Sequence, residues 1–179
     1  MRSHTLWEPE GSQVAKLKEE ELRKIAKDWL DQQFERSQFH MPFEIFHGKG
    51  PLTKHLRNKF LGTDLTSIPN YRAANVEPDI AGIIISPTGL QRLWIIAEVK
   101  GNEQVVSQSD RRQTVDYARA TSAFRAFLIS DGPLGQDVKQ DIRNGMHSYD
   151  GMFENGQKAI SYLEFFRYLE RGRQFVPNR

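Results

Sequence analysis

Apolar residues recur at intervals of three to four positions near the start of the chain, and this spacing is typical of an amphipathic helix. The residues that carry the pattern are Val14, Leu17, Leu22, Ile25, Trp29 and Leu30. Ser12 is a suitable N-cap residue, so we expect a helix from about Gln13 to Phe34. A second helix is expected from Pro51 to Phe60, where apolar residues are spaced four apart and Gly62 follows as a stop signal.

Four segments have the apolar character of β-strands. Pro42–His47 alternates apolar and polar residues, whereas Asp79–Ser86 and Arg92–Lys100 are apolar on both faces and are joined by a turn at Pro87–Gly89. Ala126–Ser130 is a further short apolar segment. Strands that are apolar on both faces are covered on both sides, so we expect a sheet between helical layers.

The rest of the chain is expected to be mostly helical. Ser107–Thr121 and Leu134–Arg143 have helical composition, and Ala159–Ile160 favours an extended strand. An apolar stripe over Tyr162–Leu169 predicts a last helix that ends near Gly172. The predicted order is therefore helix, strand, strand, strand, helix and strand, followed by a helical C-terminal part.

These elements predict an α/β fold in which helices flank a mixed central sheet. We expect one domain over residues 13–172, with flexible tails at residues 1–12 and 173–179. The chain has 179 residues, which fits a single domain. A chain near ~150 residues buries roughly two-thirds of its unfolded surface, so a sizeable core is expected.

The composition excludes several kinds of site and partner. The sequence has no cysteine, so it offers neither a disulfide-linked partner nor a cysteine-ligated zinc site. No segment approaches the ~18 consecutive apolar residues of a membrane span, and residues 1–11 lack the apolar stretch of a secretion signal. We therefore expect a cytoplasmic protein without a membrane partner.

The net charge is only +2, so the distribution of basic residues is more informative than their sum. Between His47 and Val76 five basic residues accompany one acidic residue, Asp64, and a second basic cluster follows Lys100. Such clusters bind nucleic-acid phosphates, although a solvated surface helix is the alternative for the first. The residues expected to contact nucleic acid are Lys54, Arg57, Lys59, Arg72, Arg111 and Arg112.

Two polar features stand out in the two apolar strands. Asp79 opens the first strand, and Glu98-Val99-Lys100 closes the second. A tight turn makes the strands antiparallel neighbours, so Asp79 should lie close to Glu98 and Lys100, which share one face of the sheet. Two carboxylates among apolar residues are costly to bury, and a divalent cation would offset that cost. The alternative is a solvated Glu–Lys ion pair, which contributes ~0–1 kcal/mol.

Pro78-Asp79 and Glu98-Val99-Lys100, with eighteen residues between Asp79 and Glu98, resemble the signature of the PD-(D/E)XK nuclease superfamily. The resemblance covers about Val14 to Ser130 and implies a restriction-endonuclease-like fold. It also implies a Mg²⁺-dependent deoxyribonuclease, in which Mn²⁺ can substitute. Asp79 and Glu98 would then be metal ligands, and Lys100 would orient or deprotonate the attacking water or offset negative charge.

In this family a glutamate on the first helix often joins the metal site. The candidates here are Glu19, Glu20 and Glu21. Glu21 is four residues after Leu17 and four before Ile25, so we expect it on the inward stripe and choose it as a catalytic residue and metal ligand, with Glu20 second. A solvated acidic first turn is the alternative.

The helix after the lysine strand carries a further family resemblance. Gln113 and Tyr117 are four residues apart, as in many RecB-type nucleases, and residues at this spacing share a helix face. We therefore expect both among the catalytic residues. The stretch from Gln113 to Gly132 is also similar to the nuclease domain of type I restriction subunits.

These features leave two classes of function open. The first is a DNA-cleaving enzyme, expected to be an endonuclease in restriction, repair, recombination or mobile-element processing, and associated with the nucleoid when bound to DNA. The second is a nucleic-acid-binding or assembly module of the same fold without useful catalysis. Because cutting both strands of a duplex needs two sites, a homodimer is a further hypothesis. His40, His47 and His55 lack the spacing of metal ligands, and we expect them to be isolated.

Overall fold

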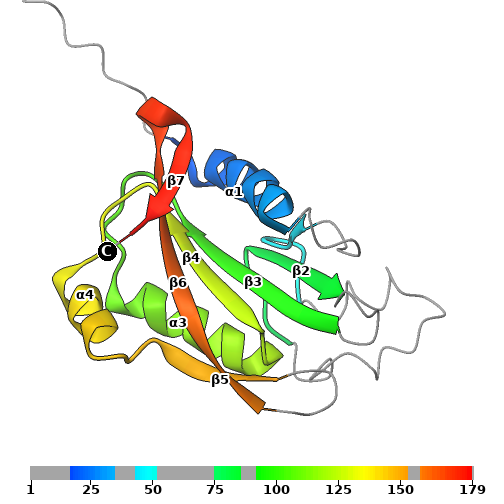
Figure 1. Ribbon diagram of the computed structural model, residues 1–179. Coiled ribbons are helices and arrows are strands. Elements are labelled where there is room, and N and C mark those ends of the chain that lie inside the picture. Colours follow the sequence, from blue (N-terminus) through cyan, green and yellow to red (C-terminus); the bar gives the residue numbers. More distant parts are fainter. Residues whose placement is uncertain (1–16, 35–42, 52–74, 86–91, 153–157, 179) are drawn as a thin grey trace, which may run out of the picture.

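The computed structural model describes residues 17–34, 43–51, 75–85, 92–152 and 158–178 (Figure 1). Within these residues a mixed sheet of seven strands is flanked by three α-helices. The helices are α1 (Glu19–Phe34), α3 (Gln108–Thr121) and α4 (Gln136–Arg143). The strands are β1 (Glu44–Ile45), β2 (Ile80–Ile85), β3 (Arg92–Lys100), β4 (Arg125–Ser130), β5 (Ser148–Met152), β6 (Lys158–Leu169) and β7 (Gln174–Pro177).

The sheet combines antiparallel and parallel pairs. Its strand order is β1-β2-β3-β4-β6-β5, and β7 pairs with β6. The first three strands are antiparallel neighbours, whereas β3, β4 and β6 run parallel to one another. The parallel connection from β3 to β4 passes through α3, as such crossovers require. The α/β class and the mixed sheet were therefore predicted correctly.

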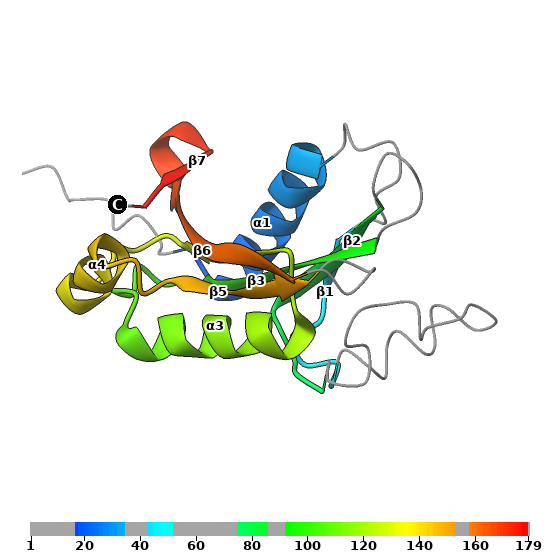
Figure 2. The same cartoon turned by 60° about the horizontal axis from the view of Figure 1, so that its bottom comes forward.

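Helices cover both faces of the sheet, as the two-sided apolar strands predicted. Figure 2 shows α1 on one side and α3 on the other. Leu22 and Leu30 of α1 pack with Ile95 of β3, whereas Val115 of α3 packs in a second cluster with Ile96. Because successive strand residues point to opposite faces, β3 contributes to both clusters in alternation.

Two predictions for the first part of the chain need adjustment. The helix α1 starts at Glu19, later than the predicted start at Gln13, and the predicted strand Pro42–His47 is reduced to Glu44–Ile45. The predicted helix Pro51–Phe60 lies almost wholly outside the described residues. The antiparallel pairing of β2 and β3, the helix α3, the strand β4 and the helix α4 agree with their predictions. The predicted turn Pro87–Gly89 lies outside the described residues.

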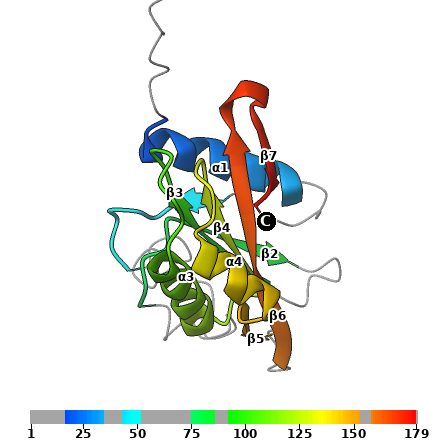
Figure 3. The same ribbon diagram turned by 90° about the vertical axis from the view of Figure 1, so that its left-hand side faces the viewer.

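The predicted last helix is wrong, because Tyr162–Leu169 belongs to the long strand β6. Buried and more exposed residues alternate from Ser161 to Phe165, which is the period of a strand. The aromatic residues suit a sheet, and pairing with β4 and β7 stabilises the extended backbone. The predicted C-terminal tail contains the strand β7, which lies beside β6 (Figure 3).

None of the helices in the described part of the chain could span a bilayer.

Candidate active site

The register of β2 and β3 brings Asp79 and Glu98 together. Ile80 pairs with Ala97, so Asp79, one residue earlier, lies opposite Glu98. The Asp79 backbone N–H donates a hydrogen bond to Glu98 Oε1 over 3.1 Å, and the Val99 N–H donates to Asp79 Oδ2 over 2.7 Å. Both acidic residues are buried, with 4% and 2% of their surface exposed. The predicted approach of these residues is therefore confirmed.

Burial gives Glu98 an unusual protonation behaviour. Loss of hydration is the largest cause, and together with repulsion from Asp79 it raises the pKa of Glu98 to about 8. The charges of Lys100 and Arg23 and the hydrogen bond from the Asp79 N–H lower this pKa, but by less. At neutral pH the Glu98 carboxyl therefore binds a proton. A cation close to both side chains would favour the doubly ionised pair.

Lys100 lies two residues beyond Glu98 and points to the same face of the sheet. Its Nζ is 3.5 Å from Asp110 Oδ1 at the start of α3. Burial would raise the pKa of Asp110, but hydrogen bonds from Ser107 and the charge of Lys100 outweigh it and hold that pKa below its ordinary value. An ionised carboxylate therefore lies beside the Lys100 ammonium group.

Sequence reasoning missed Asp110, although a signal was present. Ser107 and Asp110 form a reciprocal capping box at the start of α3, in which Asp110 Oδ2 accepts hydrogen bonds from the Ser107 N–H and hydroxyl over 2.8 and 2.6 Å. A Ser-x-x-Asp pattern shortly after a strand marks a helix start. That helix start, beside the end of β3, brings Asp110 to Lys100.

Arg23 is a second residue that sequence reasoning missed. Its guanidinium is buried, and its Nε donates to Asp79 Oδ1 over 2.9 Å. Its Nη2 contacts the carboxylate of Glu19 on the preceding turn of α1, and Glu19 Oε2 also accepts a hydrogen bond from the Gly101 N–H over 3.4 Å. The signal was a charged residue next to Leu22 on the apolar face of the first helix.

The expectation that Glu21 lies on the inward stripe is wrong. Glu21 is exposed, and its Oε2 accepts a hydrogen bond from the Lys18 backbone N–H over 3.3 Å. Glu20, the second choice, forms an exposed ion pair with Lys24. The buried stripe of α1 is centred on Leu22, Ala26 and Leu30, and Glu19 is the acidic residue nearest to it.

His47 follows β1 and lies beside Asp79. Its Nδ1 is 3.1 Å from Asp79 Oδ1, and 57% of its side chain is exposed. The neighbouring Phe46 N–H donates to the Asp79 carbonyl oxygen over 2.9 Å, which holds this segment against the start of β2. The expectation of an isolated histidine is therefore wrong for His47, and His40 and His55 lie outside the described residues.

Gln113 and Tyr117 lie further along α3. Gln113 Nε2 donates to the Tyr117 hydroxyl over 3.3 Å, and Gln113 is exposed. In the described part of the chain, the ion pair between α3 and Lys100 is made by Asp110, one turn before Gln113. Their catalytic role therefore stays a prediction.

The predicted phosphate contacts fall into three groups. Lys54, Arg57, Lys59 and Arg72 lie outside the described residues. Arg112 is exposed on α3 and is available to a ligand. Arg111 is a correction, because it is buried, its Nη2 lies 3.1 Å from Asp141 Oδ2, and its Nη1 donates to the Met146 carbonyl over 2.6 Å. Its guanidinium therefore holds α3 and α4 together.

The side chains of Asp79 and Glu98 are chemically suited to a Mg²⁺ or Mn²⁺ ion. Mg²⁺ usually binds one or two carboxylates and completes its shell with water and substrate phosphate oxygens. Asp79 already contacts a cation, the Arg23 guanidinium. Among the described residues no group of three or more histidine and acidic residues is arranged to hold a metal ion. Any such ion would therefore be held by Asp79 and Glu98 without a third histidine or acidic side chain of the described residues.

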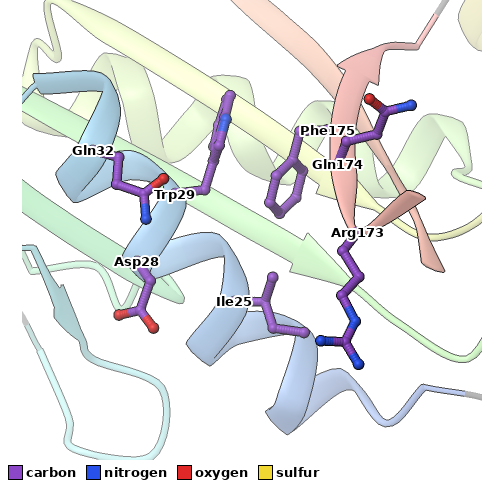
Figure 4. A pocket seen from close by; sticks show the side chains of 7 residues that line it. All are labelled: Ile25, Asp28, Trp29, Gln32, Arg173, Gln174 and Phe175. Atoms are coloured by element: carbon purple, nitrogen blue, oxygen red, sulfur yellow. The ribbon is translucent and has the colours of Figure 1, made fainter. Parts of the chain in front are cut away.

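A separate pocket of about 400 Å³ lies between α1 and β7 (Figure 4). Ile25, Trp29 and Gln32 line it from α1, and Phe175 lines it from β7. Their positions in the helical repeat place these α1 residues on the side of the helix away from Arg23. The pocket is therefore distinct from the cluster around Asp79.

Comparison with known proteins found no matching family model, curated protein or solved structure.

Proposed function

We propose that the chain is a Mg²⁺-dependent nuclease of the PD-(D/E)XK type that hydrolyses phosphodiester bonds of DNA. The observation that carries the proposal is the hydrogen bond from the Asp79 N–H to Glu98 Oε1, with both residues buried. Lys100 extends the same cluster on the same face of β3. A pair of buried acidic residues is hard to explain by stability alone, since burying carboxyl groups is costly.

The order of the elements supports the choice of fold. From α1 to β4 the described chain runs helix, strand, strand, strand, helix, strand, in agreement with the restriction-endonuclease-like core that the motif implies. The candidate residues lie where β2 begins and β3 ends. This agreement supports the restriction-endonuclease-like fold as part of the proposal.

Each residue has a defined task in this proposal. A bound Mg²⁺ ion would lower the pKa of a water ligand and stabilise charge on the phosphate. Asp79 and Glu98 would hold the ion, while the Val99 N–H and Arg23 fix the orientation of the Asp79 carboxylate. Lys100, beside Asp110, would offset the negative charge that develops on the phosphate.

The homodimer is a separate part of the proposal. Ile160 and Tyr162 of β6 are large apolar residues with 72% and 52% of their surface exposed, and exposed apolar residues of this kind can form an interface between copies. A light-scattering mass equal to one chain, both with and without DNA, would contradict the dimer and leave the cleavage proposal intact.

The test of the proposed activity is cleavage of circular and linear DNA, single- and double-stranded, with Mg²⁺, Mn²⁺ or a chelator. We expect cutting that depends on the divalent ion and is lost in Asp79→Asn. Cutting of circular DNA would identify an endonuclease. No cutting of any substrate, with DNA binding equal in the wild type and the variant, would overturn the proposal in favour of a binding module.

A further inference from the structure

Arg23 contacts the same carboxylate, that of Asp79, that a metal ion would bind. It is as buried as a core residue, with 7% of its surface exposed, and its charge is compensated by Asp79 and Glu19. A buried charge of this kind is tolerated only with close partners. Removal of Arg23 would leave the buried Asp79 carboxylate without its guanidinium partner, next to Glu98.

The hydrogen-bond capacity of Asp79 is largely used. Its Oδ1 accepts from Arg23 Nε over 2.9 Å and lies 3.1 Å from His47 Nδ1, and its Oδ2 accepts from the Val99 N–H over 2.7 Å. A carboxylate offers about four lone-pair sites. A divalent ion that binds Asp79 must therefore take the remaining site or displace one of these contacts, and in either case it comes close to the guanidinium.

We infer that Arg23 is the resident cation of this site, and that it competes electrostatically with the divalent ion that Asp79 and Glu98 would bind. Without the ion, Arg23 stabilises the Asp79 carboxylate and the fold around it. With the ion, the two positive charges repel each other across a buried site. Arg23 is thus a positioning residue that also weakens binding of the free ion, so that tight binding requires the negative charge of a substrate phosphate.

The inference rests on the proposed function for the identity of the ion, but its test needs no cleavage. The chain offers a control, because Arg111 is also 7% exposed and also forms an ion pair with a carboxylate, that of Asp141, in a different part of the fold. The variants are Arg23→Gln, which removes the charge, Arg23→Lys, which keeps it, and Arg111→Gln. The readouts are the melting temperature with and without Mn²⁺ and the Mn²⁺ dissociation constant from calorimetry.

We expect both glutamine variants to melt at lower temperature than the wild type in the absence of metal. Mn²⁺ should restore the melting temperature of Arg23→Gln but not that of Arg111→Gln, because the ion supplies the missing positive charge only at Asp79. Arg23→Gln should bind Mn²⁺ at least about tenfold more tightly than the wild type, since one repelling charge is gone. Arg23→Lys should bind Mn²⁺ with nearly the affinity of the wild type.

The inference is overturned if Mn²⁺ raises the melting temperature of Arg23→Gln no more than that of the wild type or of Arg111→Gln. It is also overturned if Arg23→Gln stays unfolded when Mn²⁺ is present. DNA cleavage by the wild type together with unchanged Mn²⁺ affinity in Arg23→Gln would remove this inference alone. Tighter Mn²⁺ binding by Arg23→Gln in a protein that cleaves no DNA would support the inference and remove the nuclease proposal.

Discussion

The N–H of Asp79 donates to Glu98 Oε1 over 3.1 Å, and both side chains are almost fully buried. The two residues are brought together by the antiparallel register of β2 and β3. Their mutual repulsion and lack of solvent make the site sensitive to every nearby charge.

The first prediction concerns stability and pH. The pKa of Glu98 is about 8 in the folded protein, above the ordinary value of 4.5. Between these values the folded state binds a proton that the unfolded state releases, so this group lowers the free energy of unfolding as the pH rises from about 4.5 to about 8. In Glu98→Gln this loss is absent, so the stability of the variant relative to the wild type should increase by about 4 kcal/mol between pH 4.5 and pH 8.

Denaturant unfolding between pH 5 and pH 9, in a chelator, measures this effect. The exposed Glu20, changed to glutamine, serves as a control and should leave the pH profile unchanged. Parallel pH profiles of Glu98→Gln and the wild type would show that Glu98 is ionised throughout this range in the folded protein.

The second prediction separates two tasks of Asp110, which caps α3 and lies 3.5 Å from the Lys100 ammonium. Asp110→Asn keeps an oxygen for the cap but loses the charge beside Lys100, and cleavage should fall about tenfold with little loss of stability. Ser107→Ala weakens the cap at a cost of about 1 kcal/mol and should leave cleavage per folded molecule unchanged. Single-turnover cleavage and thermal unfolding of both variants provide the comparison, and equal activity in the two would contradict a role in positioning Lys100.

The third prediction concerns the packing of α1 on the end of β3. A Cβ atom built on Gly101 would lie 2.5 Å from Glu19 Cα, a distance that backbone atoms cannot accept without moving. Gly101→Ala should therefore displace the start of α1 and the Glu19–Arg23 pair, with a loss of about 1–3 kcal/mol. Gly172→Ala, where the nearest atom is 3.1 Å away in the flexible Gln174 side chain, should be tolerated. Equal unfolding midpoints for the two variants would argue against this packing.

The central pair could be predicted because it depends on local geometry. The predicted turn and the two apolar strands suffice to place Asp79 opposite Glu98, and strand alternation places Lys100 on the same face. The helical layers on both faces of the sheet could likewise be predicted, because the strands are apolar on both of their faces.

Other features depend on contacts between distant segments. Arg23 reaches Asp79 only because α1 packs on one face of the sheet with its first turn beside the end of β3. The sequence alone shows no more than an arginine on the apolar face of a helix. The choice of Glu21 over Glu19 was wrong because it assumed that the buried stripe of the helix is centred on Leu17 and Ile25. The buried stripe is centred on Leu22 and Ala26. The strand β6 was mistaken for a helix because aromatic residues on both of its faces also match helical spacing.

The most direct test of the central claim is single-turnover DNA cleavage in Mg²⁺ by the wild type, Lys100→Met and Lys24→Met. Lys24 provides the matched control because its Nζ lies 3.0 Å from Glu20 in an exposed ion pair on α1. We expect Lys100→Met to lose roughly 100-fold or more of the cleavage rate with its fold intact, while Lys24→Met cleaves like the wild type. Wild-type cleavage that Lys100→Met retains in full would contradict the placement of the active site at Asp79, Glu98 and Lys100.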